Sequence, residues 1–162
     1  MDNDDTLESR TQKKKQAEGL QDFGRLLCRL APGQLATIPC PEQLLAAIKE
    51  YNRLKSHGGI RRQIQYIGKL LRSVDIEPLE VAYQAIVEQK SAADADFHRI
   101  ERWRDRLITE GKPAITEFMG EYPQTDSQQL RQQVKKAQTE PPEKKAGKRL
   151  LFQTIKEIVS AS

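Results

Sequence analysis

Aromatic and other hydrophobic residues are scarce in this chain of 162 residues. Phenylalanine, tyrosine and tryptophan make up 6% of it, and all hydrophobic residues together make up 37%. The apolar face of each helix must therefore be narrow, which favours an open helical shape and leaves little room for a large catalytic core. The longest uninterrupted apolar run, Leu44 to Ile48, is far shorter than the roughly 20 residues of a membrane-spanning helix. These scarcities predict a soluble, non-enzymatic protein without a membrane span.

The N-terminus lacks the basic residues that open a secretory signal peptide. Residues 2–8 instead hold four acids and show no apolar periodicity. Such a segment cannot bury enough apolar surface to order itself, so residues 1–10 are predicted to form a disordered acidic tail. The absence of a basic, apolar leader also predicts a cytoplasmic protein.

Cysteine and histidine are too few and too scattered to suggest metal or nucleophilic chemistry. Cys28 and Cys40 are separated by eleven residues and have no CxxC partner, and His57 and His98 lie far from both in the sequence. A Cys/His nucleophilic pair would also need a third, orienting residue, which no pattern indicates. We therefore expect two reduced thiols, no metal, no cofactor and no catalytic residue.

Charge is nearly balanced in total but segregated along the chain. There are 27 basic and 23 acidic residues, giving a net charge of +4. The stretch from Arg53 to Arg72 nevertheless holds six basic residues and no acid, and the stretch from Arg131 to Arg149 holds seven basic residues against two acids. Two separate basic surfaces suit a polyanion better than a small ligand.

Apolar spacing predicts helices throughout, and no segment shows strand alternation. The first helix is expected to end at Ala31-Pro32-Gly33, where a loop follows, and a second helix from Pro41 is expected to stop at Gly58-Gly59. Further helices are expected from Pro113 and from Asp126, and a last one carries Leu151, Ile155, Ile158 and Val159. A charged, polyproline-like linker at 140–145 is expected to separate the last two.

A long stretch without glycine or internal proline follows residue 78. Its apolar residues recur at seven-residue intervals, which one continuous helix or a tight helical hairpin would require: Leu79, Ile86, Ala93, Ile100 and Leu107. The predicted fold is therefore all-α and elongated, and the chain is predicted to be monomeric. Its N-terminal lobe would span 11–75, its connecting helix 76–110 and its C-terminal lobe 111–162.

The third predicted helix has the clearest two-sided pattern. Its apolar positions keep a strict four-three step: Ile60, Ile64, Ile67, Leu71 and Val74. The opposite face carries candidate phosphate ligands: Arg61, Arg62, Gln65, Lys69 and Arg72. Arginine forks bind phosphate in a bidentate manner, and Gly68 is expected to let an RNA backbone approach closely. A run of charges is also typical of a merely solvated face, so the residues alone leave both interpretations open.

Two further regions contribute candidate RNA-binding residues. Trp103 lies between Arg102 and Arg104, an arrangement that could stack a base, although burial in a core is the commoner role of a lone tryptophan. The C-terminal third supplies a second basic set: Arg131, Lys135, Lys136, Lys144, Lys145, Lys148 and Arg149.

Several segments resemble a known protein family. The segment at 57–72, HGGIRRQIQYIGKLLR, and the DIEP that follows at 75–78 are similar to the DarP (YjgA-like) family of bacterial large-subunit ribosome assembly factors. The resemblance continues through WRDRLI at 103–108, EYP at 121–123, QQLR at 128–131 and the Pro141-Pro142 linker before Leu151. It implies a dumbbell-like helical protein that binds rRNA in immature 50S particles and helps the peptidyl transferase centre to mature. It implies no enzyme.

Two functions are therefore compared. One is an rRNA-binding assembly factor, and the alternative is a helical adaptor that binds another protein while its basic faces only maintain solubility. Affinity for RNA should fall steeply with salt, whereas binding in an apolar groove should hardly change.

Overall fold

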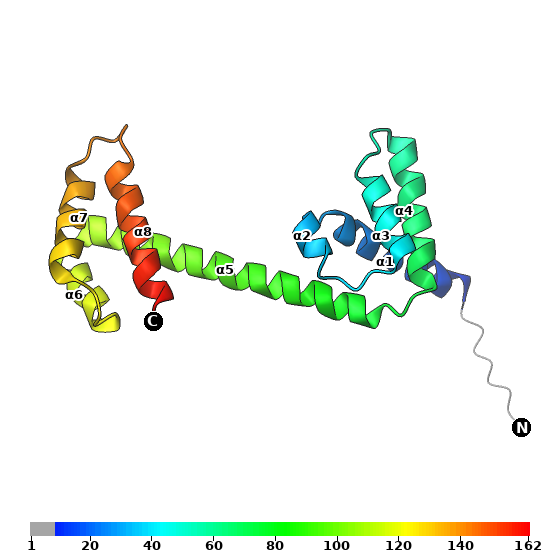
Figure 1. The fold of residues 1–162 in the computed structure, drawn as a ribbon, viewed down its shortest axis with the longest axis horizontal. Helices are drawn as coiled ribbons and strands as arrows, with labels where there is room; N and C mark the ends of the chain where they lie inside the picture. The colour runs from blue at the N-terminus through cyan, green and yellow to red at the C-terminus, as the bar shows by residue number, and fades with distance from the viewer. Residues whose placement is uncertain (1–8) are drawn as a thin grey trace, which may run out of the picture. The chain divides into compact units, whose positions relative to one another are not determined.

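The computed structural model describes residues 9–162, and this part of the chain consists of helices and their connections (Figure 1). No strand occurs among these residues, which confirms the all-α prediction. None of the helices in the same range combines the length and hydropathy of a membrane span. In chain order the helices are α1 (Arg10–Cys28), α2 (Pro32–Leu35), α3 (Glu42–Tyr51), α4 (His57–Arg72), α5 (Glu77–Glu110), α6 (Lys112–Glu121), α7 (Ser127–Thr139) and α8 (Ala146–Ser160).

The first helix begins earlier than the predicted tail allowed. Residues 1–8 of that tail lie outside the described residues, but Arg10 is the first residue of α1. The Ser9 hydroxyl accepts the Gln12 N–H at 3.2 Å, and the Gln12 side-chain oxygen accepts the Ser9 N–H at 2.9 Å. This reciprocal capping box satisfies backbone donors that would otherwise lack partners, and it fixes the start of the helix.

The chain divides into two compact units, Met1–Gln89 and Lys90–Ser162, with the boundary inside α5. Each unit has its own hydrophobic core. The three-part division predicted from the sequence, with a separate connector at 76–110, remains a prediction.

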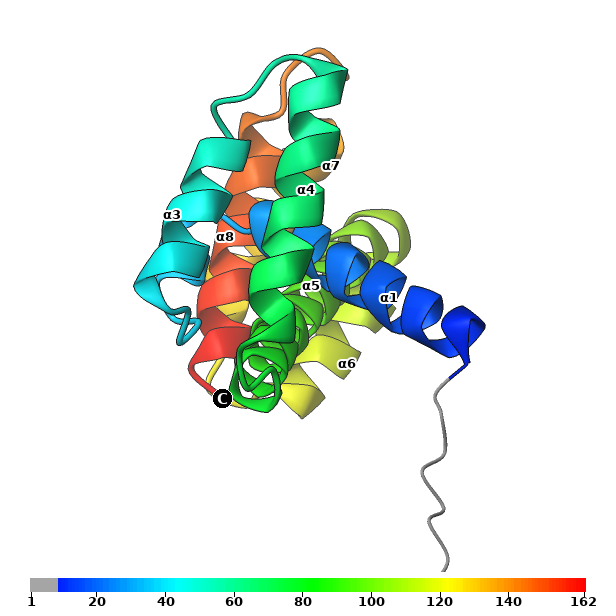
Figure 2. The same cartoon turned by 90° about the vertical axis from the view of Figure 1, so that its right-hand side faces the viewer.

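In the first unit, α1 and α3 both pack on α4 (Figure 2). The predicted apolar face of α4 is buried at Ile64, Ile67 and Leu71 and half-buried at Ile60, whereas Val74, also half-buried, lies beyond the end of the helix. The three buried residues join a core completed from neighbouring segments by Leu27, Cys28, Leu35, Ile38, Leu44, Ala47, Ile48 and Leu79. Burial of this stripe supplies the main stabilisation of α4, because burying one Ile or Leu side chain contributes about 1.5–3 kcal/mol.

Two predicted helix ends in this unit were wrong. The first helix ends at Cys28, and Pro32 begins the short helix α2 instead of terminating α1. The second predicted helix ends at Tyr51, whereas Gly58 and Gly59 lie in the first turn of α4. The Ser56 hydroxyl accepts the Gly59 N–H at 3.2 Å. Because this serine caps the helix, the glycines are held in helical geometry.

Helix α5 is a single helix of 34 residues, which decides against a hairpin. Leu79 belongs to the core of the first unit, and Ile100 and Leu107 belong to that of the second. Between them, residues 87–99 are all exposed. The seven-residue spacing therefore predicted the helix correctly, while Ala93 in its middle has no core to pack against.

In the second unit, α7 packs on both α6 and α8. The Asp126 carboxylate accepts the N–H groups of Gln128 and Gln129 at 2.9 and 3.0 Å, as the predicted cap requires. The buried core is formed by Ile100, Trp103, Leu107, Ala114, Ile115, Phe118, Tyr122, Leu130, Val134, Ala137, Leu151, Ile155 and Val159.

The connection between α7 and α8 is a closed turn and not the extended linker predicted from its prolines. The Lys144 N–H donates to the Pro141 carbonyl at 3.0 Å. Both carboxylate oxygens of Glu140 accept the Gly147 N–H, at 3.0 and 2.9 Å, at the start of α8. A Cβ on Gly147 would lie 3.2 Å from the Ala137 Cα. Glycine at this position therefore lets the two helices approach closely where the turn brings them together.

Candidate functional site

The five candidate residues of α4 form one exposed row. At about 100° per residue, positions 61, 62, 65, 69 and 72 fall within about 100° of arc, and all five side chains are exposed. Their arc is centred almost opposite the buried stripe of Ile64, Ile67 and Leu71. The α4 row is the name used below for Arg61, Arg62, Gln65, Lys69 and Arg72.

The four cations of the α4 row are electrostatically unopposed. None of them forms an ion pair with another residue in the range 9–162. Helix α4, which carries them, is also fixed to α3. The Gln63 side-chain N–H donates to the Ala47 carbonyl of α3 at 2.8 Å. The Gln43 amide donates to the hydroxyl of Tyr66, a 40%-exposed ring beside the row, at 3.1 Å. The charges are thus carried by a helix fixed to its neighbours and need no rearrangement of the backbone to meet an anion.

Gly68 does not have the role predicted from the sequence. It is buried where α4 meets α1, and a Cβ on it would lie 2.9 Å from the Gln21 Cγ. Gly24 of α1 makes the matching approach, since a Cβ there would lie 2.8 Å from the Ile67 Cγ2. Gly68 therefore serves the packing of α1 on α4, not the approach of an RNA backbone.

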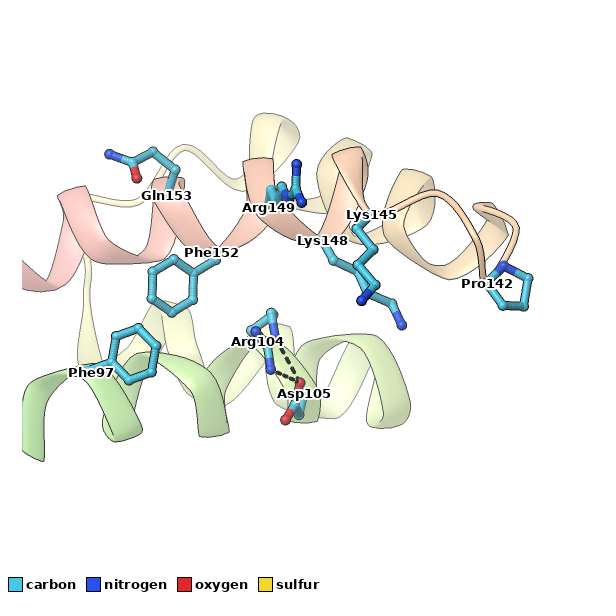
Figure 3. A pocket seen from close by; sticks show the side chains of 9 residues that line it. All are labelled: Phe97, Arg104, Asp105, Pro142, Lys145, Lys148, Arg149, Phe152 and Gln153. Atoms are coloured by element: carbon cyan, nitrogen blue, oxygen red, sulfur yellow. Dashed lines mark hydrogen bonds and ion pairs between the residues drawn. The ribbon is translucent and has the colours of Figure 1, made fainter. Parts of the chain in front are cut away.

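In the second unit, α5 and α8 border a groove of about 550 Å³ (Figure 3). Four predicted RNA-binding residues line it: Arg104, Lys145, Lys148 and Arg149. Phe97 from α5 and Phe152 from α8 also line it, and their ring centroids are 5.3 Å apart. This set, which we call the α5/α8 groove, combines positive charge with aromatic surface.

A second hollow brings other predicted residues together. Arg131 and Lys135 line a depression of about 630 Å³ with Lys112, which was not predicted from the sequence. Lys112 starts α6 just after Gly111, the only residue in the described range with a positive φ, at 67°. The hollow thus unites residues from α6 and α7 that are far apart in sequence. Lys136 and Lys144 are exposed outside both hollows.

Trp103 is a core residue, which is the commoner role of a lone tryptophan. It is 6% exposed, and its ring makes an edge contact with Phe118 at 5.1 Å. Arg102 is exposed and lines a hollow of about 370 Å³ together with Trp103, whereas Arg104 lines the α5/α8 groove. The two neighbouring arginines therefore lie at different hollows, and the indole, at 6% exposure, offers little surface on which a base could stack.

The cation that lies over Trp103 is Arg106, with its guanidinium carbon 5.0 Å from the ring centroid. Arg106 bridges Glu110 at 2.9 Å and Glu117 at 2.6 Å. Hydrogen bonds from Arg106 hold the pKa of both carboxyls below its usual value and raise the pKa of the guanidinium. Arg106 therefore ties α5 to α6 and is already neutralised, which makes it a poor phosphate ligand.

Both cysteines are free thiols. Cys28 is 5% exposed in the core of the first unit, and burial raises its pKa from 9.0 to about 11. Burial also raises the pKa of the Cys40 thiol. Residues 9–162 contain no group of three or more His, Cys, Asp or Glu side chains placed to hold a metal ion.

Native Cys28 is expected to resist alkylation, because the thiolate is the reactive species and burial disfavours it. At pH 8, iodoacetamide should modify the half-buried Cys40 faster than Cys28, as followed by mass spectrometry of the cysteine-containing peptides. Unfolded Cys28 loses its proton near pH 9, whereas the folded thiol keeps it until about pH 11. The free energy of unfolding should therefore fall as pH rises through this interval. Rapid alkylation of Cys28 in the folded protein would contradict its burial.

Comparison with known proteins extends over almost the whole chain. Residues 6–156 match the profile of the family described as "Dual-action ribosomal maturation protein DarP". Proteins of that name from Chromobacterium violaceum and Nitrosomonas eutropha are 39% and 40% identical, and each alignment covers 96% of this chain and 87% or 91% of the relative. One from Vibrio cholerae is 41% identical over 94% of this chain and 80% of its own length. These matches confirm the resemblance found in the sequence and show that the chain belongs to the DarP family.

Proposed function

We propose that this protein is a bacterial ribosome maturation factor that binds rRNA in immature 50S particles in the cytoplasm and promotes maturation of the peptidyl transferase centre. The family and the relatives' printed name, ribosomal maturation protein, support a role on ribosomal particles. In this proposal the protein acts as a monomer, by binding and not by catalysis.

The α4 row is the observation that carries the proposal. It presents Arg61, Arg62, Lys69 and Arg72 on one exposed face, without an ion-pair partner in the described chain. The electric field of a paired cation is largely cancelled by its anionic partner, whereas the fields of these four cations are not cancelled in this way. Binding to a nucleic acid releases condensed counterions from phosphates, which is the main source of sequence-independent affinity.

The second unit would provide further phosphate contacts. Unpaired cations line both the α5/α8 groove, at Lys145, Lys148 and Arg149, and the hollow formed by Lys112, Arg131 and Lys135. Loss of either unit's basic residues should therefore weaken binding without abolishing it, because the remaining contacts still tether the protein.

The adaptor alternative has less support. A partner helix needs a continuous apolar groove. The large apolar side chains that are exposed in the described chain are instead spread over four helices: Leu26, Tyr66, Val81, Val87, Phe97 and Leu150. The hollows of about 550 and 630 Å³ are both lined by cations.

The salt dependence of particle binding tests the proposal. Tagged protein should co-sediment with large-subunit precursors at low salt. Its affinity should fall log-linearly as salt rises, by about three orders of magnitude between 50 and 200 mM if at least six phosphates are contacted. Mature 50S subunits serve as the control particle and should bind less. Affinity that stays constant over this range would favour the adaptor.

A further inference from the structure

Phe97 is an exposed aromatic residue on a part of α5 that packs against no hydrophobic core. Its side chain is 48% exposed and lies in the stretch 87–99 of α5, which has no core to cover it. Single exposed apolar residues are ordinary. Phe97, however, meets a second ring, Phe152 of α8, at 5.3 Å with an interplanar angle of 55° (Figure 3).

Phe152 fixes the geometry of this ring pair. It is half-buried and packs against the core of the second unit. The Arg104 guanidinium lies 6.0 Å from its ring centroid. An aromatic surface held by core packing loses little side-chain entropy when a flat ligand stacks on it.

Unpaired cations flank the two rings. Lys148 and Arg149 follow Lys145, the N-cap of α8, by three and four residues and precede Phe152 by four and three, so all four lie on one side of the helix. Figure 3 shows Lys145 and Lys148 extending from α8 toward α5. None of the three forms an ion pair with a residue in the described range, whereas Arg104 contacts Asp105 at 2.8 Å and Glu101 at 3.8 Å.

We infer that the α5/α8 groove binds an unpaired segment of RNA, with one base stacked on the exposed ring of Phe97 and the adjoining phosphates against Lys145 and Lys148. The inference rests on the proposed function and specifies which form of RNA the α5/α8 groove binds. The groove volume of about 550 Å³ lies within the roughly 300–1,000 Å³ of sites that hold small ligands.

The combination of aromatic rings with cations favours an unpaired RNA strand over an RNA duplex or an acidic protein segment. A base in a duplex is already stacked and paired, so it cannot offer a free face to Phe97, whereas a base in a loop or at an end can. An acidic protein segment would use the cations and leave the aromatic pair without a role. Base stacking is tolerant of sequence, so the groove should accept an unpaired strand of almost any composition.

The test compares three polyanions with the full-length chain. The probes are a single-stranded RNA of about 12 nucleotides, within the range that such surfaces cover, a blunt RNA duplex of the same length, and poly-L-glutamate. The variants are Phe97→Ala, Phe97→Trp and, as a control, Val87→Ala, which shortens another exposed apolar side chain of α5 (40% exposed). Fluorescence anisotropy gives the Kd of each pair, and thermal melting by circular dichroism shows that each variant is folded.

We expect Phe97→Ala to weaken single-strand binding by about 5- to 150-fold, the range that one base–aromatic stack contributes. Duplex binding should change by less than about twofold, Phe97→Trp should retain the single-strand affinity, and Val87→Ala should behave as the unmodified protein. If the unmodified protein binds RNA in a salt-dependent manner but Phe97→Ala binds both RNAs normally, the stacking site is overturned and the proposed function stands. Poly-L-glutamate binding as tight as that of RNA, with neither weakened by Phe97→Ala, would assign the groove's cations to an acidic protein. No RNA binding at all would overturn both proposals.

Discussion

Replacing Arg61, Arg62, Lys69 and Arg72 with glutamate should lower the affinity for large-subunit precursors by roughly two or more orders of magnitude. Each substitution removes one cation from the α4 row and adds a repulsive carboxylate facing phosphate. The slope of log K against log salt should fall by about one unit for each lost contact. Stability should change little, since these side chains are exposed and form no ion pair within the described chain.

A matched variant separates the α4 row from net charge. Lys13, Lys15, Lys49 and Lys90 are also exposed, lie outside the row and form no ion pair with another described residue. Reversing these four gives the same formal net charge as reversing the four of the row. Sedimentation with precursor particles should be nearly normal for this scattered variant and severely reduced for the other. Equal losses would show that only total charge matters, and normal binding by both would move the adaptor ahead.

The sequence was sufficient to predict α4 because the helix is determined by one strong, local pattern. Ile64, Ile67 and Leu71 recur with the helical period, and cations occupy the opposite arc. A helix with such separated faces can bury only one of them. The exposed row is therefore a direct consequence of the periodicity, and the structure has all five of its residues at the surface.

Residues whose role depends on a distant partner could not be assigned in the same way. Gly68 looked like a point of access for RNA because it adjoins Lys69, but its neighbour in space is Gln21 of another helix. Gly58 and Gly59 looked like a stop signal, but the Ser56 hydroxyl makes them a helix start. Glycine permits both outcomes, and the surrounding contacts select between them.

The α5/α8 groove shows the same limit for a binding surface. The seven-residue spacing predicted α5, and Phe97 lies four residues after Ala93 and three before Ile100 of that spacing. Spacing does not reveal where along a helix the core ends, and the exposed stretch 87–99 includes Phe97. Phe152 and the α8 cations reach the same groove because α5 and α8 share one core in the second unit. The ion pair of Arg106, in contrast, is indicated by the local sequence, since Glu110 follows Arg106 by four residues on the same helix.

Replacing Trp103 with alanine should have the largest effect on stability of the changes considered. The indole is 6% exposed and packs edge-on against Phe118 beneath the Arg106 guanidinium. Removing a buried aromatic side chain leaves a cavity and costs about 3–5 kcal/mol. For a chain of this size that loss corresponds to a melting temperature lower by roughly 6–20 °C. Calorimetry and far-ultraviolet circular dichroism measure it without relying on tryptophan fluorescence.

The same variant also decides between the two roles weighed for Trp103. At a temperature well below its melting point, the folded Trp103→Ala protein should bind single-stranded RNA within about twofold of the unmodified chain, because stacking in this unit is expected at Phe97. Trp103→Phe, which retains a ring against Phe118, should recover most of the stability. The contrast with Phe97→Ala is the critical result, since one substitution should affect folding and the other binding. A Trp103→Ala protein with normal stability and lost RNA binding would restore the base-stacking role to the indole and refute its assignment to the core.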